Sequence, residues 1–260
     1  MPEAHRGDIA VTLENHVAVV EIRRPPHNFF SHALIRDLAD AFAELDGEVE
    51  CRSILLCSEG KAFCAGADFA GDRIFEAAES RGRNPLYDEA VRLFSGVKPV
   101  VAAVQGAAIG GGLGLALVAD FRVACPEARF AANFVRLGIH PGFGLTHTLP
   151  QAIGQQRAAL MFLTGRRIGG EEAAAWGLVD QLVPQAELRG TAMALAAEIA
   201  EGAPLAVQST RLTLRRHLAA AVRDQTDREG AEQAWLARTE DHQEGIRAVA
   251  ERRAGRFGAR

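Results

Sequence analysis

The sequence predicts an α/β fold with a parallel sheet, followed by an all-helical C-terminal region. Short, continuous apolar segments at 53–57 and 99–106 are typical of strands that are buried on both faces of a sheet. A glycine turn, a helical pattern and another strand follow the second segment, and this order requires helical crossovers between parallel strands. From Glu187 onward every regular segment has helical spacing. We therefore expect a core over 1–200 and a C-terminal helical region over 201–260.

The N-terminal residues are expected to form a hairpin and then a helix. Two runs rich in β-branched residues, 9–13 and 17–22, are separated by a short polar turn. Ser31 is a suitable N-cap for the following helix, and Gly47 ends it. The apolar residues of this helix recur at helical spacing, which predicts one buried face: Leu34, Ile35, Leu38, Phe42 and Leu45.

The rest of the core contains shorter elements. Residues 121–125 have the pattern of a strand, and residues 155–165 have the pattern of a helix that ends at Gly165. A short helix, a stop at Gly177 and a strand complete the core. The polar segment 70–90 carries several groups that could take part in proton transfer: Asp72, Glu76, Glu79, Tyr87 and Asp88.

Composition and charge argue against several classes of protein. The chain has 260 residues, and its formal net charge of −4 disfavours nucleic acid as the main partner. No uninterrupted apolar stretch reaches the roughly 18 residues of a membrane span, and the N-terminus has no signal-peptide pattern. The four cysteines form no C-x-x-C pair, which is typical of reduced thiols. We expect a cytoplasmic protein with no metal site.

Two glycine-containing loops indicate an anion site. Residues 110–112 lie between an apolar strand and a helical pattern, where free backbone N–H groups and the helix dipole favour negative charge. They match neither G-x-G-x-x-G nor G-K-[ST], and close helix–strand packing would explain them equally well. A second loop, 61–69, also follows a buried strand. One N–H from each loop could bind a single carbonyl oxygen and stabilise an enolate or a tetrahedral oxyanion.

Five motifs cover the whole core in order: RPPHN at 24–28, GKAFCAGADF at 60–69, KPVVAAVQGAAIGGGLGLALVADFRVA at 98–124, FVRLGIHPGFG at 134–144 and LTGRRIGGEEAAAWGLVDQLVP at 163–184. Together they resemble the crotonase (enoyl-CoA hydratase/isomerase) superfamily. The resemblance implies a crotonase-like spiral of ββα units with an all-helical C-terminal trimerisation region. It also implies an acyl-CoA substrate, no cofactor beyond the coenzyme A of that substrate, and a homotrimer or a dimer of trimers.

The same resemblance assigns roles to residues of the glycine loops. The backbone N–H groups of Ala67 and Gly111 would form an oxyanion hole for the thioester oxygen. Contacts to coenzyme A would come from the second loop and from two residues near it: Ala65, Asp68, Phe69, His27 and Lys61. A solvated loop lysine would explain Lys61 equally well.

Two positions depart from the family pattern. Family hydratases carry one glutamate three residues after the oxyanion glycine and another four residues before the glycine that precedes the P-G turn; here these positions are Gly114 and Phe134. Hydration needs a base for water and an acid for the α-carbon, and neither residue can transfer a proton. The standard two-glutamate hydration is therefore not expected. The two residues favour an apolar, enlarged acyl pocket that suits a bulky or cyclic group.

Another group must then carry the proton, and His140 is a candidate. It directly precedes the P-G turn, which faces the acyl group in the family, and histidine titrates near neutral pH. A hydrogen bond within the turn would also explain this residue.

Three kinds of function are compatible with these features. The first is an enzyme that acts on an acyl-CoA through an enolate, as an isomerase, a C–C hydrolase or lyase, or an atypical hydratase. The alternative is a non-catalytic protein that binds acyl-CoA with the same fold. The third, nucleic-acid binding, rests on five arginines in the tail 246–260. A solvated chain end, or a contact to a neighbouring subunit's coenzyme A phosphate, would explain these arginines as well.

Overall fold

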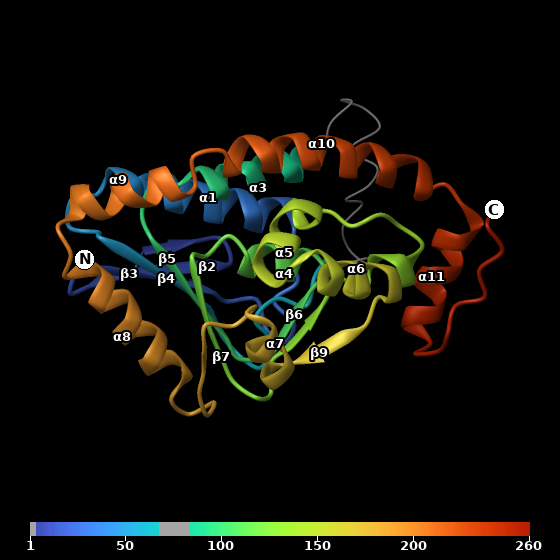
Figure 1. Cartoon of the computed structure of the whole chain (residues 1–260), viewed down its shortest axis with the longest axis horizontal. Coiled ribbons are helices and arrows are strands. Elements are labelled where there is room, and N and C mark those ends of the chain that lie inside the picture. The colour runs from blue at the N-terminus through green and yellow to red at the C-terminus, as the bar shows by residue number, and fades with distance from the viewer. Residues whose placement is uncertain (1–3, 68–83) are drawn as a thin grey trace.

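The computed structural model describes residues 4–67 and 84–260, and a seven-stranded sheet forms its central layer (Figure 1). In spatial order the strands are β1 (Ala4–Arg6), β2 (Ile9–Glu14), β3 (Val17–Ile22), β4 (Ser53–Ser58), β5 (Val100–Val104), β7 (Phe121–Ala124) and β10 (Gln181–Leu182). The first three strands pair antiparallel, and every later pair in this sheet is parallel. The predicted hairpin and the parallel sheet are confirmed.

A smaller sheet holds the second set of strands. It contains β6 (Ala107–Ile109), β8 (Arg129–Ala131) and β9 (Arg167–Gly169), with β6 parallel and β9 antiparallel to β8. The strand β6 begins just after β5 ends and leads into the helix α4 (Gly111–Ala116). The glycine run therefore follows a strand of the small sheet, which the sequence pattern did not separate from β5.

Besides α4, the described residues form ten further helices around the sheets, one of which is a 3-10 helix. They are α1 (His32–Gly47), α3 (Pro85–Ser95), η1 (Asn133–Leu137), α5 (Leu145–Ile153), α6 (Gln155–Thr164), α7 (Gly170–Trp176), α8 (Leu188–Ala200), α9 (Pro204–Leu214), α10 (Leu218–Leu236) and α11 (Glu240–Ala250). The predicted start of α1 is confirmed, because the Ser31 side chain accepts a hydrogen bond from the Leu34 N–H at 3.2 Å. All five apolar residues predicted for its inner face are buried.

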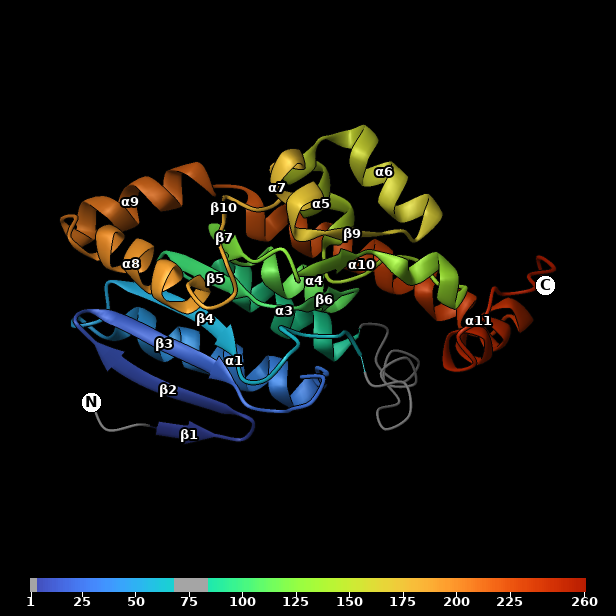
Figure 2. The same ribbon diagram turned by 90° about the horizontal axis from the view of Figure 1, so that it is seen from below.

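The two faces of the main sheet pack against different helices. Side chains alternate along β3, so Val17 and Val19 face the buried alanines of α8, while Ala18 and Val20 belong to the core shared with α1 and α3. Figure 2 shows the hairpin strands at one side of the molecule and α5, α6 and α7 at the opposite side. No helix of the described residues combines the length and the apolar character that crossing a membrane requires.

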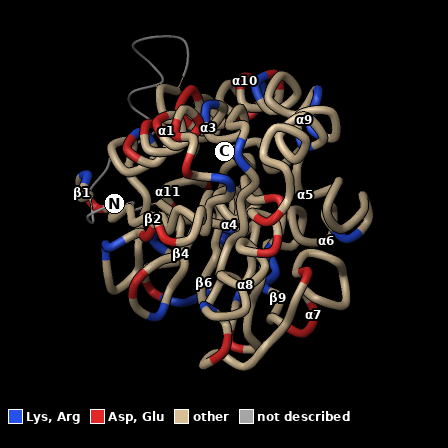
Figure 3. The backbone as a smooth tube through the Cα atoms, turned by 90° about the vertical axis from the view of Figure 1, so that its left-hand side faces the viewer, with Lys and Arg blue, Asp and Glu red and all other residues tan. Residues whose placement is uncertain are grey.

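The C-terminal helices are joined to the sheet by a buried ion pair. Arg211 of α9 and Arg215, the residue that follows α9, each donate to the Asp120 carboxylate, at 2.7 Å and 2.6 Å. The Val100 N–H also donates to it, at 2.8 Å. Burial alone would raise the pKa of Asp120, but the two guanidinium groups hold it below its usual value. The expected boundary near residue 200 falls in the turn between α8 and α9. Figure 3 shows both signs of charge interspersed along α1, α3 and α10.

Candidate active site

Two loops far apart in the sequence are held together by backbone hydrogen bonds. Cys64 and Ala108 form an isolated parallel β-bridge. The Cys64 N–H donates to the Ala107 oxygen at 2.8 Å, and the Ile109 N–H donates to the Cys64 oxygen at 3.0 Å. Parallel pairing advances both chains in step. It therefore brings Ala67, three residues after Cys64, toward Gly111, three residues after Ala108.

The backbone N–H groups at these two positions are available to a ligand. Gly111 is the first residue of α4, where the helix itself offers no acceptor for the N–H. Within residues 4–67 and 84–260, neither this N–H nor that of Ala67 donates a hydrogen bond to the protein. Both residues line the same cavity.

Glycine is required where the loops approach each other most closely. A Cβ built on Gly112 would lie 2.0 Å from the Cys64 oxygen, and one on Gly111 would lie 2.2 Å from the ring of Phe30. Gly66 has a φ of +94°, and its Cβ would lie 2.9 Å from the Ile109 oxygen. The glycines therefore allow close packing, as one interpretation of the sequence expects, and the same arrangement leaves backbone N–H groups uncovered. The anion site stays a prediction.

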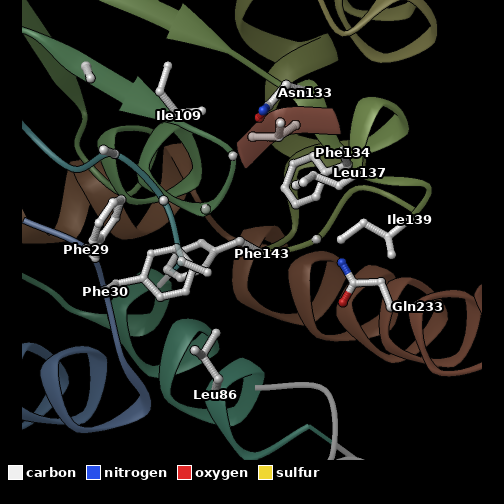
Figure 4. A pocket seen from close by; sticks show the side chains of 18 of the residues that line it. Phe29, Phe30, Leu86, Ile109, Asn133, Phe134, Leu137, Ile139, Phe143 and Gln233 are labelled. Carbon is white, nitrogen blue, oxygen red and sulfur yellow. The ribbon is translucent and has the colours of Figure 1, made fainter. Parts of the chain in front are cut away.

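An apolar cavity of about 390 Å³ lies beside these loops (Figure 4). Four phenylalanine rings form much of its wall: Phe29, Phe30, Phe134 and Phe143. Polar side chains in the wall are few: Tyr87, Asn133, Arg167 and Gln233. No aspartate, glutamate or histidine is among the lining residues in the described part of the chain. This part of the wall therefore contains no carboxylate or imidazole that could act as a base.

The expectation that Gly114 enlarges the cavity is wrong. Gly114 is buried and is absent from the cavity wall, because the ring of Phe143 occupies the space beside it. A Cβ built on Gly114 would lie 2.6 Å from the Phe143 Cδ1. Phe134, by contrast, lines the cavity as expected for a residue of an apolar acyl pocket.

A strained backbone holds Phe143 in this position. Its φ is +65°, a value that bulky residues rarely adopt, and Gly144 follows with +71°. The buried Glu229 of α10 holds this turn by accepting from the Gly144 N–H at 2.7 Å and from the Thr146 N–H at 3.0 Å. These bonds also cap the N-terminus of α5, which has no side-chain cap of its own.

His140 is not in the cavity beside the glycine loops. It lines a different cavity of about 720 Å³, together with residues of α10 and the C-terminal tail. Its ring Nδ1 lies 2.8 Å from the Pro141 oxygen, which can only accept, so the ring donates a hydrogen bond within the turn. The structure therefore corrects the prediction that His140 acts on the acyl group, in favour of the turn hydrogen bond.

The residues predicted to contact coenzyme A lie at and near the same loop. Ala65 lines the cavity, and its N–H donates to the His27 oxygen at 3.0 Å. His27 and Lys61 are exposed, and the His27 ring lies 5.0 Å from that of Phe29. Asp68 and Phe69 lie outside the described residues, as do Asp72, Glu76 and Glu79. The coenzyme A contacts, and the absence of a metal or further cofactor, stay predictions.

Sequence reasoning missed the polar pair in the cavity wall. The Tyr87 hydroxyl of α3 donates to Gln233 Oε1 of α10 at 2.6 Å. Tyr87 was one of several candidates for proton transfer, but its partner is 146 residues away. No local pattern marks Gln233, because its role arises only when α10 packs against α3.

Comparisons with known proteins identify the family of the chain. The model of the family Enoyl-CoA hydratase/isomerase matches residues 12–260. The (E)-benzylidenesuccinyl-CoA hydratase of Thauera aromatica is 35% identical, over 95% of this chain and 98% of the relative. The short-chain-enoyl-CoA hydratase of Clostridium acetobutylicum is 32% identical, over 95% and 96%.

A solved structure supports the same assignment. The crystal structure of an enoyl-CoA hydratase/isomerase from Pseudoalteromonas atlantica T6c superposes with a TM-score of 0.86 at 29% identity, and the match covers 96% of this chain and 100% of that one. The fold class expected from the motifs is thereby confirmed. The chain belongs to the enoyl-CoA hydratase/isomerase family of the crotonase superfamily.

Proposed function

We propose that this protein is an enzyme that acts on an acyl-CoA thioester by stabilising an enolate. The observation that carries the proposal is the pairing of the two loops, which brings the free N–H groups of Ala67 and Gly111 to one apolar cavity. A thioester oxygen bound by both groups would be stabilised as charge develops on it. Fixed donors of this kind contribute on the order of 100-fold or more each to the rate.

The reaction is proposed to differ from two-glutamate hydration. Gly114 and Phe134 occupy the positions where the resemblance expects the two glutamates, and the described cavity wall contains no carboxylate. An isomerisation, a C–C hydrolysis or lysis, or hydration with an atypical proton carrier fits this wall better. Asp72, Glu76 and Glu79 are candidates for that carrier from the sequence alone.

The acyl group is proposed to be bulky and preferentially aromatic. Four phenylalanine rings line the cavity, and the rings of Phe30 and Phe143 already lie in a tilted pair with centroids 5.9 Å apart. Aromatic rings favour such tilted or offset contacts with a further ring. A relative named for benzylidenesuccinyl-CoA, whose acyl group contains a phenyl ring, supports this choice.

Exchange of α-protons tests the proposal without knowledge of the final product. We expect the protein to incorporate deuterium from D₂O at the α-carbon of 3-phenylpropionyl-CoA, measured by mass spectrometry. Ala67→Pro removes one N–H, so exchange should fall about 100-fold or more. Ala67→Ser keeps the N–H and is the matched control. Undiminished exchange in Ala67→Pro would contradict the assigned oxyanion hole.

The lack of a carboxylate in the described wall also favours a second candidate, a non-catalytic acyl-CoA-binding protein. Calorimetry separates the two. Tight binding of 3-phenylpropionyl-CoA with neither exchange nor product from a panel of enoyl and aryl thioesters would support the binding protein over the enzyme.

A further inference from the structure

We propose that Tyr87, held by Gln233, recognises a hydroxyl group on the acyl portion of the substrate, with the Tyr87 oxygen as hydrogen-bond acceptor. The inference rests on the proposed function, because it requires an acyl group in the cavity. It narrows the substrate class to thioesters whose acyl group has an aromatic body and a hydroxyl at its far end.

The hydrogen bonds of Gln233 fix the direction of the bond to Tyr87. Gln233 Nε2 donates to the His140 backbone oxygen at 2.8 Å. A carbonyl oxygen can only accept, so the amide cannot be turned over, and Oε1 must face the phenol. The Tyr87 hydroxyl therefore donates its one proton to Gln233, at 2.6 Å. Only acceptor capacity is left on the Tyr87 oxygen for a ligand.

The phenol keeps its proton in this environment. Burial, and then the negative charge of Glu229, raise the pKa of Tyr87 well above its usual value, although the bond to Gln233 and the nearby Phe143 N–H act in the opposite direction. Tyr87 is therefore a neutral hydrogen-bonding group rather than a base at physiological pH. The Tyr87 oxygen has two lone pairs, and one of them is assigned to a bound hydroxyl.

Gly142 packs directly against the Tyr87 oxygen. A Cβ built on Gly142 would lie 2.0 Å from this oxygen, and both residues line the cavity. Any other residue at 142 would push a side chain against the phenolic oxygen. The missing side chain at Gly142 therefore lets the phenolic oxygen lie beside the cavity as one of the few polar groups in its wall.

A row of contacts places this spot away from the proposed oxyanion hole. The Phe30 ring packs on Gly111, Phe143 pairs with Phe30, and Gly142 connects Phe143 to Tyr87. In Figure 4, Gln233 lies at one side of the cavity and Ile109 at the other, with Phe143 and Phe134 between them. A thioester carbonyl at Gly111 and a hydroxyl at Tyr87 would thus be separated by an aromatic body along these rings.

Binding of three saturated thioesters tests the inference. Calorimetry on the full chain would compare 3-(4-hydroxyphenyl)propionyl-CoA, its 4-methoxy analogue and 3-phenylpropionyl-CoA. We expect the hydroxylated ligand to bind wild type about tenfold more tightly than the phenyl ligand, as one neutral hydrogen bond allows. The methoxy ligand, which cannot donate, should gain nothing. Tyr87→Phe should abolish the preference and leave the phenyl ligand's Kd unchanged. Asn133→Leu, in another part of the wall, should preserve the preference.

A second variant keeps the test decisive if Tyr87→Phe is poorly folded. Gln233→Met frees the phenolic proton, so the methoxy ligand, an acceptor, should now bind more tightly than the phenyl ligand. Equal affinities for the hydroxyl and phenyl ligands in wild type, or a preference that survives in Tyr87→Phe, would overturn the inference while leaving the proposed function intact. If neither coenzyme A nor any thioester binds, the proposed function fails and the inference fails with it.

Discussion

Glu229 is a residue whose buried charge should be visible in the stability of the protein. Burial raises the pKa of Glu229 from 4.5 to about 7. The unfolded chain releases this proton near pH 4.5, whereas the folded protein keeps it until about pH 7. The stability contributed by this group is therefore fully present below pH 4.5 and is lost as the pH rises toward 7, by up to about 3 kcal/mol.

Glu229→Gln should remove this pH dependence. The amide keeps one acceptor oxygen but turns its NH2 toward one of the two donors, Gly144 or Thr146, so we expect a loss of about 1–3 kcal/mol at pH 5. The loss should be smaller at pH 8, where wild type carries the buried charge. Urea unfolding at a series of pH values measures the difference, and the exposed Glu198→Gln is the control. A loss that is the same at both pH values would contradict the raised pKa.

The positions of single residues were predicted where the backbone alone decides them. Gly111 and Ala67 were located by motif and spacing, and both line the cavity. The errors concern side chains whose surroundings come from distant segments. Gly114 offers no space because Phe143, on a strained turn, fills it. His140 bonds within its own turn and lines a different cavity from the one beside the glycine loops.

The helices α1 and α5 show why some helix ends could be predicted and others could not. The helix α1 carries its N-cap Ser31 and a periodic apolar face, so its bounds follow from the sequence. The helix α5 has Pro150 in its interior and no side-chain cap. Its N-terminus is instead capped by Glu229 from a helix about 80 residues later in the chain. No local pattern predicts such a helix.

The attachment of α9 to the sheet depends on Asp120. Asp120→Asn would leave Arg211 and Arg215 buried without their counter-charge, which costs about 3–5 kcal/mol in comparable buried pairs. We expect a loss of this size in the free energy of unfolding, measured with urea at pH 7. Because the pKa of Asp120 is held below its usual value, the stability that it contributes should also be lost as the pH falls through that lowered pKa.

An exposed pair provides the comparison for this prediction. Asp88 and Arg223 join α3 to α10 at 3.4 Å, but both side chains are more than 40% exposed. Asp88→Asn should therefore cost no more than about 1 kcal/mol. Equal losses in the two variants would show that burial does not strengthen the Asp120 pair.

At the scale of the whole molecule, an unpartnered apolar row on α9 bears on the predicted homotrimer or dimer of trimers. Leu205 is 80% exposed and Leu212 is 47% exposed, and seven residues separate them, so they lie on one face of α9. We expect this face to be covered by a second copy of the chain. Leu205→Glu together with Leu212→Glu should shift the mass in light scattering toward the monomer. Arg216 lines the same surface hollow as Leu205 and Leu212, so Arg216→Glu tests whether a change of charge alone has this effect. A wild type that is monomeric at micromolar concentration would contradict the prediction.

The bridge between Cys64 and Ala108 has a consequence for how this protein could diversify. The groups proposed to hold the thioester oxygen are main-chain atoms, and main-chain hydrogen bonds align them. Substitutions in the cavity wall, such as a glutamate exchanged for Phe134, leave this alignment untouched. Mutations in the wall can therefore change the acyl group that is bound and the residue that carries the proton, while the proposed binding of the thioester oxygen is retained. The reaction can change during evolution because the proposed binding of the thioester depends on the main chain and not on side chains.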